Sequence, residues 1–88
     1  MKIWGKLLKE NRIVKDKVVS IEEEDSYQES LKKCMLNICR EFDIERPYWL
    51  PVNVDEYNRR RKTSFTSENF IDSFEYDKFV IEEILKKD

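Results

Sequence analysis

The sequence predicts an α+β fold in which an antiparallel sheet carries one long amphipathic helix on one of its faces. Two observations support this prediction: β-prone segments stand at both ends of the chain, and a helical stripe of apolar residues stands between them. The expected order of elements is β-β-α-α-β-β. The 88 residues suffice for one core, so we expect a single domain over residues 1–88.

The first two elements are expected to form a β-hairpin. Residues 2–10 and 13–21 are rich in aliphatic and β-branched side chains, and Asn11-Arg12 stands between them. Asparagine tolerates the positive φ of a tight hairpin turn. Gly5 is the only glycine, and within a strand it indicates either a bulge or a close contact between strand and helix.

The clearest local signal is a helix over 26–43. Ser26 and Glu29 match a capping box, and Asp25 with Gln28 offers an alternative frame one residue earlier. The apolar positions then recur at three- and four-residue spacing: Tyr27, Leu31, Cys34, Met35, Ile38 and Phe42. Cys34 and Cys39 lie about 140° apart around a helix axis. They cannot pair with each other, and we expect two reduced, partly buried thiols.

The second half of the chain predicts shorter elements. Pro47 ends the first helix, and Tyr48-Trp49-Leu50-Pro51 forms an aromatic connection. Asn53 as N-cap and Glu56 three residues later predict a short helix over 54–60. A short strand over 62–66 and a turn over 67–70, capped by Thr66 or Ser67, are expected next. Residues 74–85 predict the last strand, although 82–87 could instead be helical.

The composition argues against an enzyme and against a metal or cofactor site. The chain contains no histidine, which is the commonest general base and metal ligand, and two cysteines alone do not complete a zinc site. A single glycine excludes the glycine-rich phosphate loops. The acidic run 22–25 lacks the ligand spacing of a calcium loop and suits a solvated helix N-terminus better. We therefore expect no catalytic residues, no metal and no cofactor.

Charge and hydropathy predict a cytoplasmic protein that does not associate with a membrane. The 17 Lys and Arg residues nearly balance the 19 Asp and Glu residues, for a net charge of −2. Such a balance supplies no overall field that would draw the protein onto nucleic acid or an anionic membrane. No apolar run approaches the ~20 residues of a membrane span, and Met1–Lys6 does not resemble a signal peptide.

Two groups of residues are candidates for binding. Trp4, Tyr48 and Trp49 are candidate anchors for a protein partner, because Trp, Tyr and Arg dominate interface hot spots. The structural alternative is that these rings simply fill the core. The cluster Arg59, Arg60, Arg61 and Lys62 could contact nucleic acid. Its structural alternative is favourable positive charge at a helix C-terminus.

The chain resembles a family of short proteins of clostridial-type Firmicutes that has no established activity. The residues that carry the resemblance are Met1-Lys2-Ile3-Trp4-Gly5-Lys6, Cys39-Arg40-Glu41-Phe42-Asp43, Pro47 with Trp49-Leu50, and Asn69-Phe70-Ile71. The resemblance spans most of the length and implies a bacterial, soluble, single-domain protein. It carries over no functional site.

These observations favour a non-enzymatic protein-interaction domain. Such a domain could serve as an adaptor, a regulatory subunit or an inhibitor, and an inhibitor derived from a phage or mobile element fits equally well. The alternative is a nucleic-acid-binding module that uses the basic cluster 59–62. The partner protein is not identified by the sequence, and self-association is left open.

Overall fold

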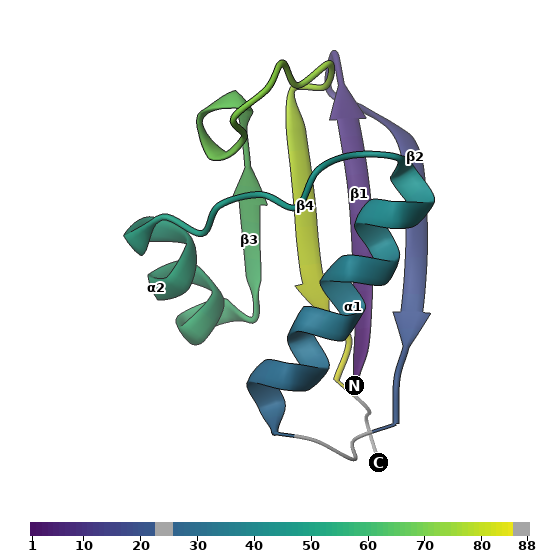
Figure 1. The fold of residues 1–88 in the computed structure, drawn as a ribbon, viewed down its shortest axis with the longest axis vertical. Coiled ribbons are helices and arrows are strands. Elements are labelled where there is room, and N and C mark those ends of the chain that lie inside the picture. The colour runs from purple at the N-terminus through teal and green to yellow at the C-terminus, as the bar shows by residue number, and fades with distance from the viewer. Residues whose placement is uncertain (23–25, 86–88) are drawn as a thin grey trace.

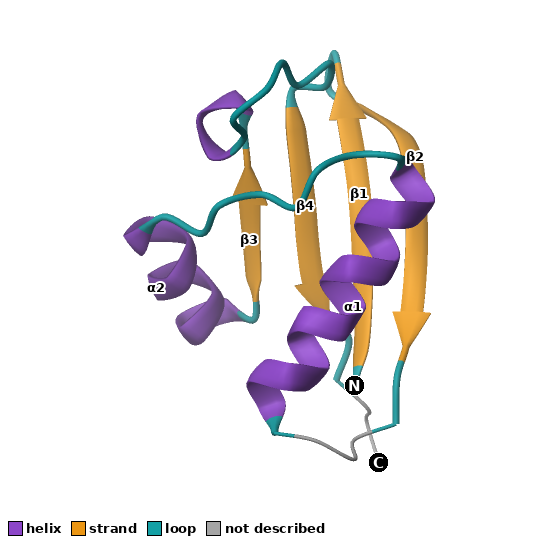
Figure 2. Cartoon of the chain, viewed as in Figure 1, coloured by secondary structure: helices purple, strands orange, loops and turns teal. Residues whose placement is uncertain are grey.

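The protein folds as a four-stranded antiparallel sheet with two α-helices (Figures 1 and 2). The computed structural model describes residues 1–22 and 26–85. The strands lie in the order β2-β1-β4-β3. The elements are β1 (Lys2–Lys9), β2 (Arg12–Ser20), α1 (Tyr27–Phe42), α2 (Pro51–Arg60), β3 (Lys62–Phe65), the 3₁₀ turn η1 (Ser67–Asn69) and β4 (Lys78–Glu83). The predicted α+β class and antiparallel sheet are confirmed, and the turn expected over 67–70 forms as η1, an element that the expected order β-β-α-α-β-β does not count.

The β1–β2 hairpin forms where it was predicted, with a turn one residue earlier than expected. The antiparallel pairing runs from Lys2 opposite Ser20 to Lys9 opposite Arg12. Glu10 and Asn11 both have positive φ, 53° and 64°. Two consecutive left-handed residues match the right-handed twist of the flanking strands. Asn11 is therefore the second residue of the turn rather than the first.

Helix α1 begins and ends as its sequence predicts. The Oγ of Ser26 accepts a hydrogen bond from the Glu29 backbone N–H at 3.3 Å, which confirms Ser26 as the N-cap. The alternative cap Asp25 and most of the acidic run, 23–25, lie outside the described residues. At the other end Asp43 adopts a left-handed conformation, φ 56°, and its N–H bonds back to carbonyls of the last turn.

The core lies between α1 and one face of the sheet. In Figures 1 and 2, α1 crosses in front of β1 and β2, and α2 lies beside β3. The residues of this core that are least exposed are Ile3, Leu7, Cys34, Met35, Ile38, Cys39, Phe42, Tyr57, Phe65, Phe79 and Ile81. Of the predicted stripe, Tyr27 is exposed and Leu31 only partly buried, whereas Cys34, Met35, Ile38 and Phe42 are buried.

Gly5 is the point of closest approach between the sheet and α1. A Cβ placed on Gly5 would lie 2.7 Å from Cγ2 of Ile38, which is well inside van der Waals contact. Its φ is not in the left-handed region, so conformational freedom is not the reason for this glycine. The second of the two sequence interpretations, a close contact between strand and helix, is confirmed.

Helix α2 begins three residues before the predicted start. Pro51 occupies the first helical position, where its fixed φ and missing N–H are favourable. Leu50 is the N-cap, so the expected capping role of Asn53 is wrong. Asn53 is the third helical residue instead, and its Oδ1 accepts a hydrogen bond from the Leu50 N–H at 3.0 Å.

The last part of the chain has a shorter strand than predicted. Strand β3 and the turn capped by Thr66 form as expected, and the Thr66 Oγ1 accepts from the Glu68 N–H. Strand β4 starts only at Lys78, because the aromatic residues before it pack on one another in an irregular segment. Residues 84–85 do not form a helix, and 86–88 lie outside the described residues. None of the helices in the described ranges is long and apolar enough to span a membrane.

Candidate interaction surface

The three candidate anchors lie on two different faces of the molecule. Trp4 alternates along β1 with the buried Ile3 and Gly5, so its side chain points to the sheet face away from α1. Its indole N–H donates to Oδ2 of Asp16 at 3.0 Å, and Nζ of Lys6 lies 3.9 Å from its ring centre. Trp4 is therefore held by neighbours on its own sheet and is separate from the other two aromatics.

Trp49 packs into the edge of the core, whereas its neighbour Tyr48 is exposed. The Trp49 ring meets Tyr57 and Phe65 edge to face, at centroid distances of 5.5 and 5.1 Å. Such aromatic pairs add to the stability gained from burial. Tyr48 is 59% exposed. Of the two neighbouring rings in the connection between the helices, Tyr48 is therefore the exposed one, and Trp49 is partly buried against the core.

Tyr48 borders an open groove between α1 and the segment that joins the two helices. The groove has a volume of about 620 Å³. Its apolar lining comes from three parts of the chain, namely Leu31 and Met35, Pro47 to Trp49, and Ile71. Ile71 is 74% exposed, the largest exposed fraction among the large hydrophobic residues of the described ranges. Polar groups of Gln28, Lys32, Glu45 and Arg46 complete the lining.

Ile71 is the groove residue that sequence reasoning missed as a binding candidate. It belongs to the irregular segment between η1 and β4, in which no helical or strand periodicity assigns side chains to faces. The one available signal was an isoleucine beside Asp72 and Ser73, in a stretch too polar to be a core strand. That pattern indicates an exposed apolar side chain but does not say what it lies beside.

A buried polar network fixes the backbone that carries Tyr48. Asn69 accepts the Tyr48 N–H at its carbonyl and donates its side-chain amide to the Tyr48 carbonyl, both at 2.7 Å. The same amide donates to Oδ1 of Asn53 at 2.8 Å, and Asn53 donates in turn to Thr63 Oγ1 at 3.0 Å. Fully satisfied networks of this kind rigidify the elements that they join. One wall of the groove is therefore fixed before any partner arrives.

The basic cluster does not form one continuous positive patch. Arg59 pairs with Asp55 at 2.8 Å, and Lys62 lies 3.7 Å from Glu82. Arg61 has φ 56° at the end of α2, and its guanidinium bonds to the Asn58 carbonyl and lies 3.7 Å from Glu83. Of the four, only the Arg60 side chain has no hydrogen bond or ion pair with another described residue. Three of these four side chains are thus engaged within the chain, at or just beyond the C-terminus of α2.

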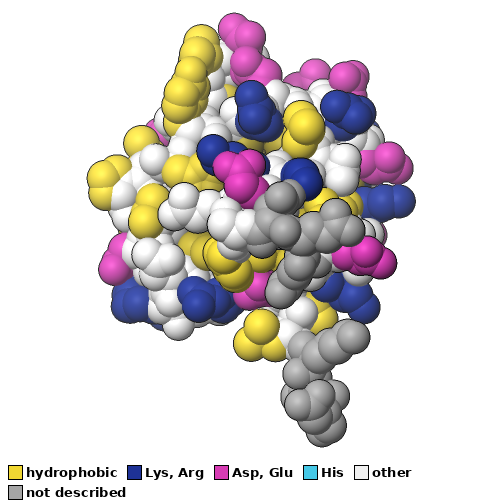
Figure 3. Space-filling model, turned by 60° about the horizontal axis from the view of Figure 1, so that its bottom comes forward, with side chains coloured by type: hydrophobic (Ala, Val, Ile, Leu, Met, Phe, Trp, Pro, Cys, Tyr) yellow, Lys and Arg dark blue, Asp and Glu magenta, His cyan; other side chains and the backbone are white. Residues whose placement is uncertain are grey.

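One face of the molecule carries side chains of both charge signs (Figure 3). On this face, basic, acidic and hydrophobic side chains are interspersed.

The two thiols lie inside the core, and burial raises the pKa of the Cys39 thiol to about 12. A protonated, buried thiol is a poor nucleophile. Within residues 1–22 and 26–85, no group of three or more His, Cys, Asp and Glu side chains is arranged to hold a metal ion.

Comparison of the chain with protein-family models, with curated proteins and with solved structures finds no match. The resemblance to a family of short clostridial-type proteins therefore stays a prediction.

Proposed function

We propose that this protein is a small, non-enzymatic interaction domain that binds a protein partner through the groove beside Tyr48. Its role would be that of an adaptor, a regulatory subunit or an inhibitor. The observation that carries the proposal is the exposure of Ile71 and Tyr48 at one apolar groove. A contiguous exposed apolar surface is unfavourable in water unless something covers it, and such surfaces mark binding sites.

The rigidity of the groove supports the same proposal. Tyrosine supplies a large contact area with few rotatable bonds, and Tyr48 stands on backbone that Asn69 holds at both its N–H and its carbonyl. Because little freedom remains to be lost, an aromatic side chain displayed in this way binds at a smaller entropic cost. The charged groups of Lys32 and Arg46 at the lining would form the polar rim typical of protein interfaces.

The test is affinity capture from a bacterial lysate with matched surface variants. We expect the wild-type protein to retain a stoichiometric protein partner, and Tyr48→Ala and Ile71→Ser to lose it. Val54→Ser is the control, because Val54 is 46% exposed on α2 and does not line the groove. If no protein is captured, or if all three variants capture it equally, the proposal is wrong.

The same experiment distinguishes the alternative class. Capture of nucleic acid instead of protein, with retention that weakens steeply as salt rises and is lost when Arg59 and Arg60 are replaced by Ala, would favour a nucleic-acid-binding module. We expect the protein outcome, because ion pairs within the chain already hold Arg59, Arg61 and Lys62.

A further inference from the structure

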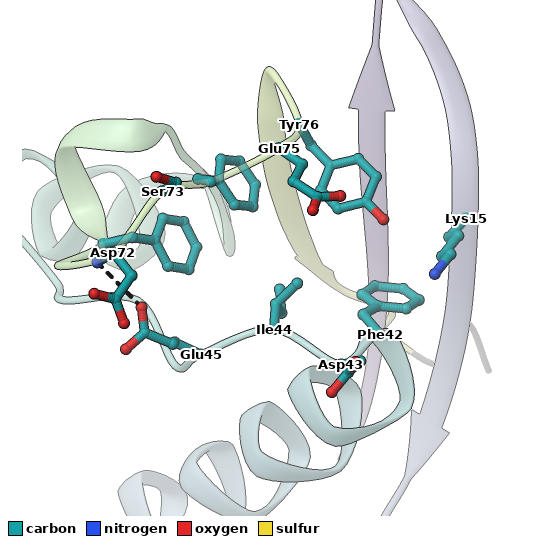
Figure 4. A pocket seen from close by; sticks show the side chains of 11 residues that line it. Lys15, Phe42, Asp43, Ile44, Glu45, Asp72, Ser73, Glu75 and Tyr76 are labelled. Carbon is teal, nitrogen blue, oxygen red and sulfur yellow. Dashed lines mark hydrogen bonds between the residues drawn. The ribbon is translucent and has the colours of Figure 1, made fainter.

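A second cavity adjoins the groove where the end of α1 meets the segment before β4. It has a volume of about 340 Å³ (Figure 4). This is at the lower end of the range for ligand pockets and suits one side chain better than a whole small molecule. Glu45 lines both this cavity and the groove, so a partner seated in the groove can reach the cavity.

Aromatic rings form much of the wall of this cavity. Phe70 and Phe74 stack with 4.3 Å between ring centres and an angle of 10°. Tyr76 follows at 5.6 Å from Phe74, tilted by 60°, and Phe42 at the end of α1 also lines the cavity. Aromatic faces carry a negative quadrupole potential and attract cations that lose part of their hydration.

Carboxylates surround the rings. Asp43, Glu45, Asp72 and Glu75 all line the cavity and all are exposed, and Figure 4 shows them spread around it. Glu45 accepts a hydrogen bond from the Asp72 N–H at 3.3 Å, which ties the two sides together. Lys15 from β2 is the one basic residue of the lining. Four carboxylates against one ammonium leave a net charge of −3 around a cavity with aromatic walls.

We propose that this cavity binds an arginine side chain presented by the protein partner. The guanidinium is planar, stacks on aromatic faces and is weakly hydrated, and it pairs with carboxylates through two parallel hydrogen bonds. A lysine ammonium would gain the charge attraction but not the stacking. The inference rests on the proposed function, because the arginine belongs to the partner that the groove binds.

The direct test is a ¹H–¹⁵N NMR titration of the full chain with the capped tripeptide N-acetyl-Gly-Arg-Gly-amide. We expect a dissociation constant on the order of 1 mM, with shifts centred on the amides of Phe70, Phe74, Tyr76 and Glu45. The matched ligand is the same peptide with citrulline, which keeps the shape of arginine but carries no charge. It should produce no comparable shifts, and the lysine peptide should bind more weakly than the arginine peptide.

Charge variants test whether binding of the arginine peptide depends on the charges that line the cavity. Asp72→Asn and Glu75→Gln should each weaken arginine-peptide binding about two- to fivefold, the effect of a single exposed charge pair. Lys15→Gln should tighten binding, because it removes the one repulsive charge of the lining. Glu68→Gln is the control: Glu68 is exposed on η1 and does not line the cavity, so its removal should leave binding unchanged.

Equal shifts with the citrulline peptide would overturn the proposal, and so would the absence of shifts at about 10 mM arginine peptide, ten times the expected dissociation constant. The two proposals fail separately. Peptide binding without any partner in the lysate capture would overturn the groove proposal and leave the arginine site standing. A captured partner that binds the Asp72→Asn and Glu75→Gln variants with the same dissociation constant as the wild type would overturn the arginine site alone.

Discussion

The contact between Gly5 and Ile38 predicts that Gly5→Ala destabilises the wild-type protein but stabilises a variant in which the Ile38 side chain is shortened. Both residues are buried, and the side chain of Ile38, which belongs to α1, is fully buried. The Cβ added by Gly5→Ala would meet Cγ2 of Ile38 at 2.7 Å and Cδ1 at 3.3 Å, with Phe79 behind at 3.4 Å. The added methyl group therefore has no room in the wild-type protein. It gains room only when the isoleucine side chain is shortened.

The magnitudes follow from this geometry. Ile38→Ala should cost roughly 2–5 kcal/mol, since it removes a fully buried side chain and leaves a cavity. Gly5→Ala alone should cost about 0.5–2 kcal/mol, because overpacking outweighs the entropy gained by replacing a strand glycine. In the Ile38→Ala background the same change should stabilise by about 1 kcal/mol or more, since the methyl now fills the cavity. The coupling energy is then about 1.5–3 kcal/mol, in the upper part of the range for residues in contact.

Urea denaturation of the four proteins in this cycle measures the coupling directly. If Ile38→Ala alone leaves too little folded protein, Ile38→Leu supplies a second background, because leucine lacks Cγ2 but keeps the side-chain volume. Gly5→Ala should then cost less than it does in the wild type. Additive effects, with Gly5→Ala equally destabilising in every background, would refute the close approach of α1 to β1.

Three further predictions concern stability. Trp49→Ala should cost about 2 kcal/mol or more, because the ring packs on the core, whereas Lys32→Ala should stay within about ±0.5 kcal/mol in the same urea assay. Asn69→Ala should cost about 1–3 kcal/mol, because the Tyr48 carbonyl loses its side-chain donor and Asn53 Oδ1 loses one of its two donors. The raised pKa of Cys39, about 12 against 9.0 for an unburied thiol, means that the unfolded chain loses this proton first. The stability that this thiol contributes should therefore be full below pH 9 and fall as the pH rises from 9 toward 12. Urea midpoints measured across that range should fall less steeply with pH in Cys39→Ala than in the wild type.

The elements that could be predicted from the sequence are those whose signals are local. Ser26 caps α1 through a residue three positions away, and the apolar spacing that follows it is a property of the helix alone. The hairpin likewise depends on two adjacent strands and on a turn at Asn11. Each of these signals lies within a few residues of the structure it specifies. Even so, the spacing could not show that only four of the six stripe residues are buried, because burial depends on how far the sheet extends beneath the helix.

The elements that could not be predicted depend on contacts between distant parts of the chain. Asn53 has the sequence signature of an N-cap, but its amide is buried against β3 and η1, and Pro51 starts the helix earlier. The sequence left open whether Trp49 is a binding anchor or fills the core, because Phe65, on which its ring packs, stands sixteen residues later. Neither Thr63 nor Phe65 can be identified as the partner from spacing alone.

The candidate surface was hardest to predict, because the groove and the cavity beside it are each lined in part by segments without regular secondary structure. Residues 44–50 and 70–77 are held side by side by the bonds from Tyr48 to Asn69 and from Asp72 to Glu45, which join residues 21 and 27 positions apart. Irregular backbone has no period that assigns side chains to faces, so the exposure of Ile71 follows only from this pairing. The regular elements fix where the two segments begin and end. Residues 71–73 are exposed, so substitutions there change the candidate surface, whereas Phe70, Phe74 and Tyr76 pack against the core and tie the same segment to the fold.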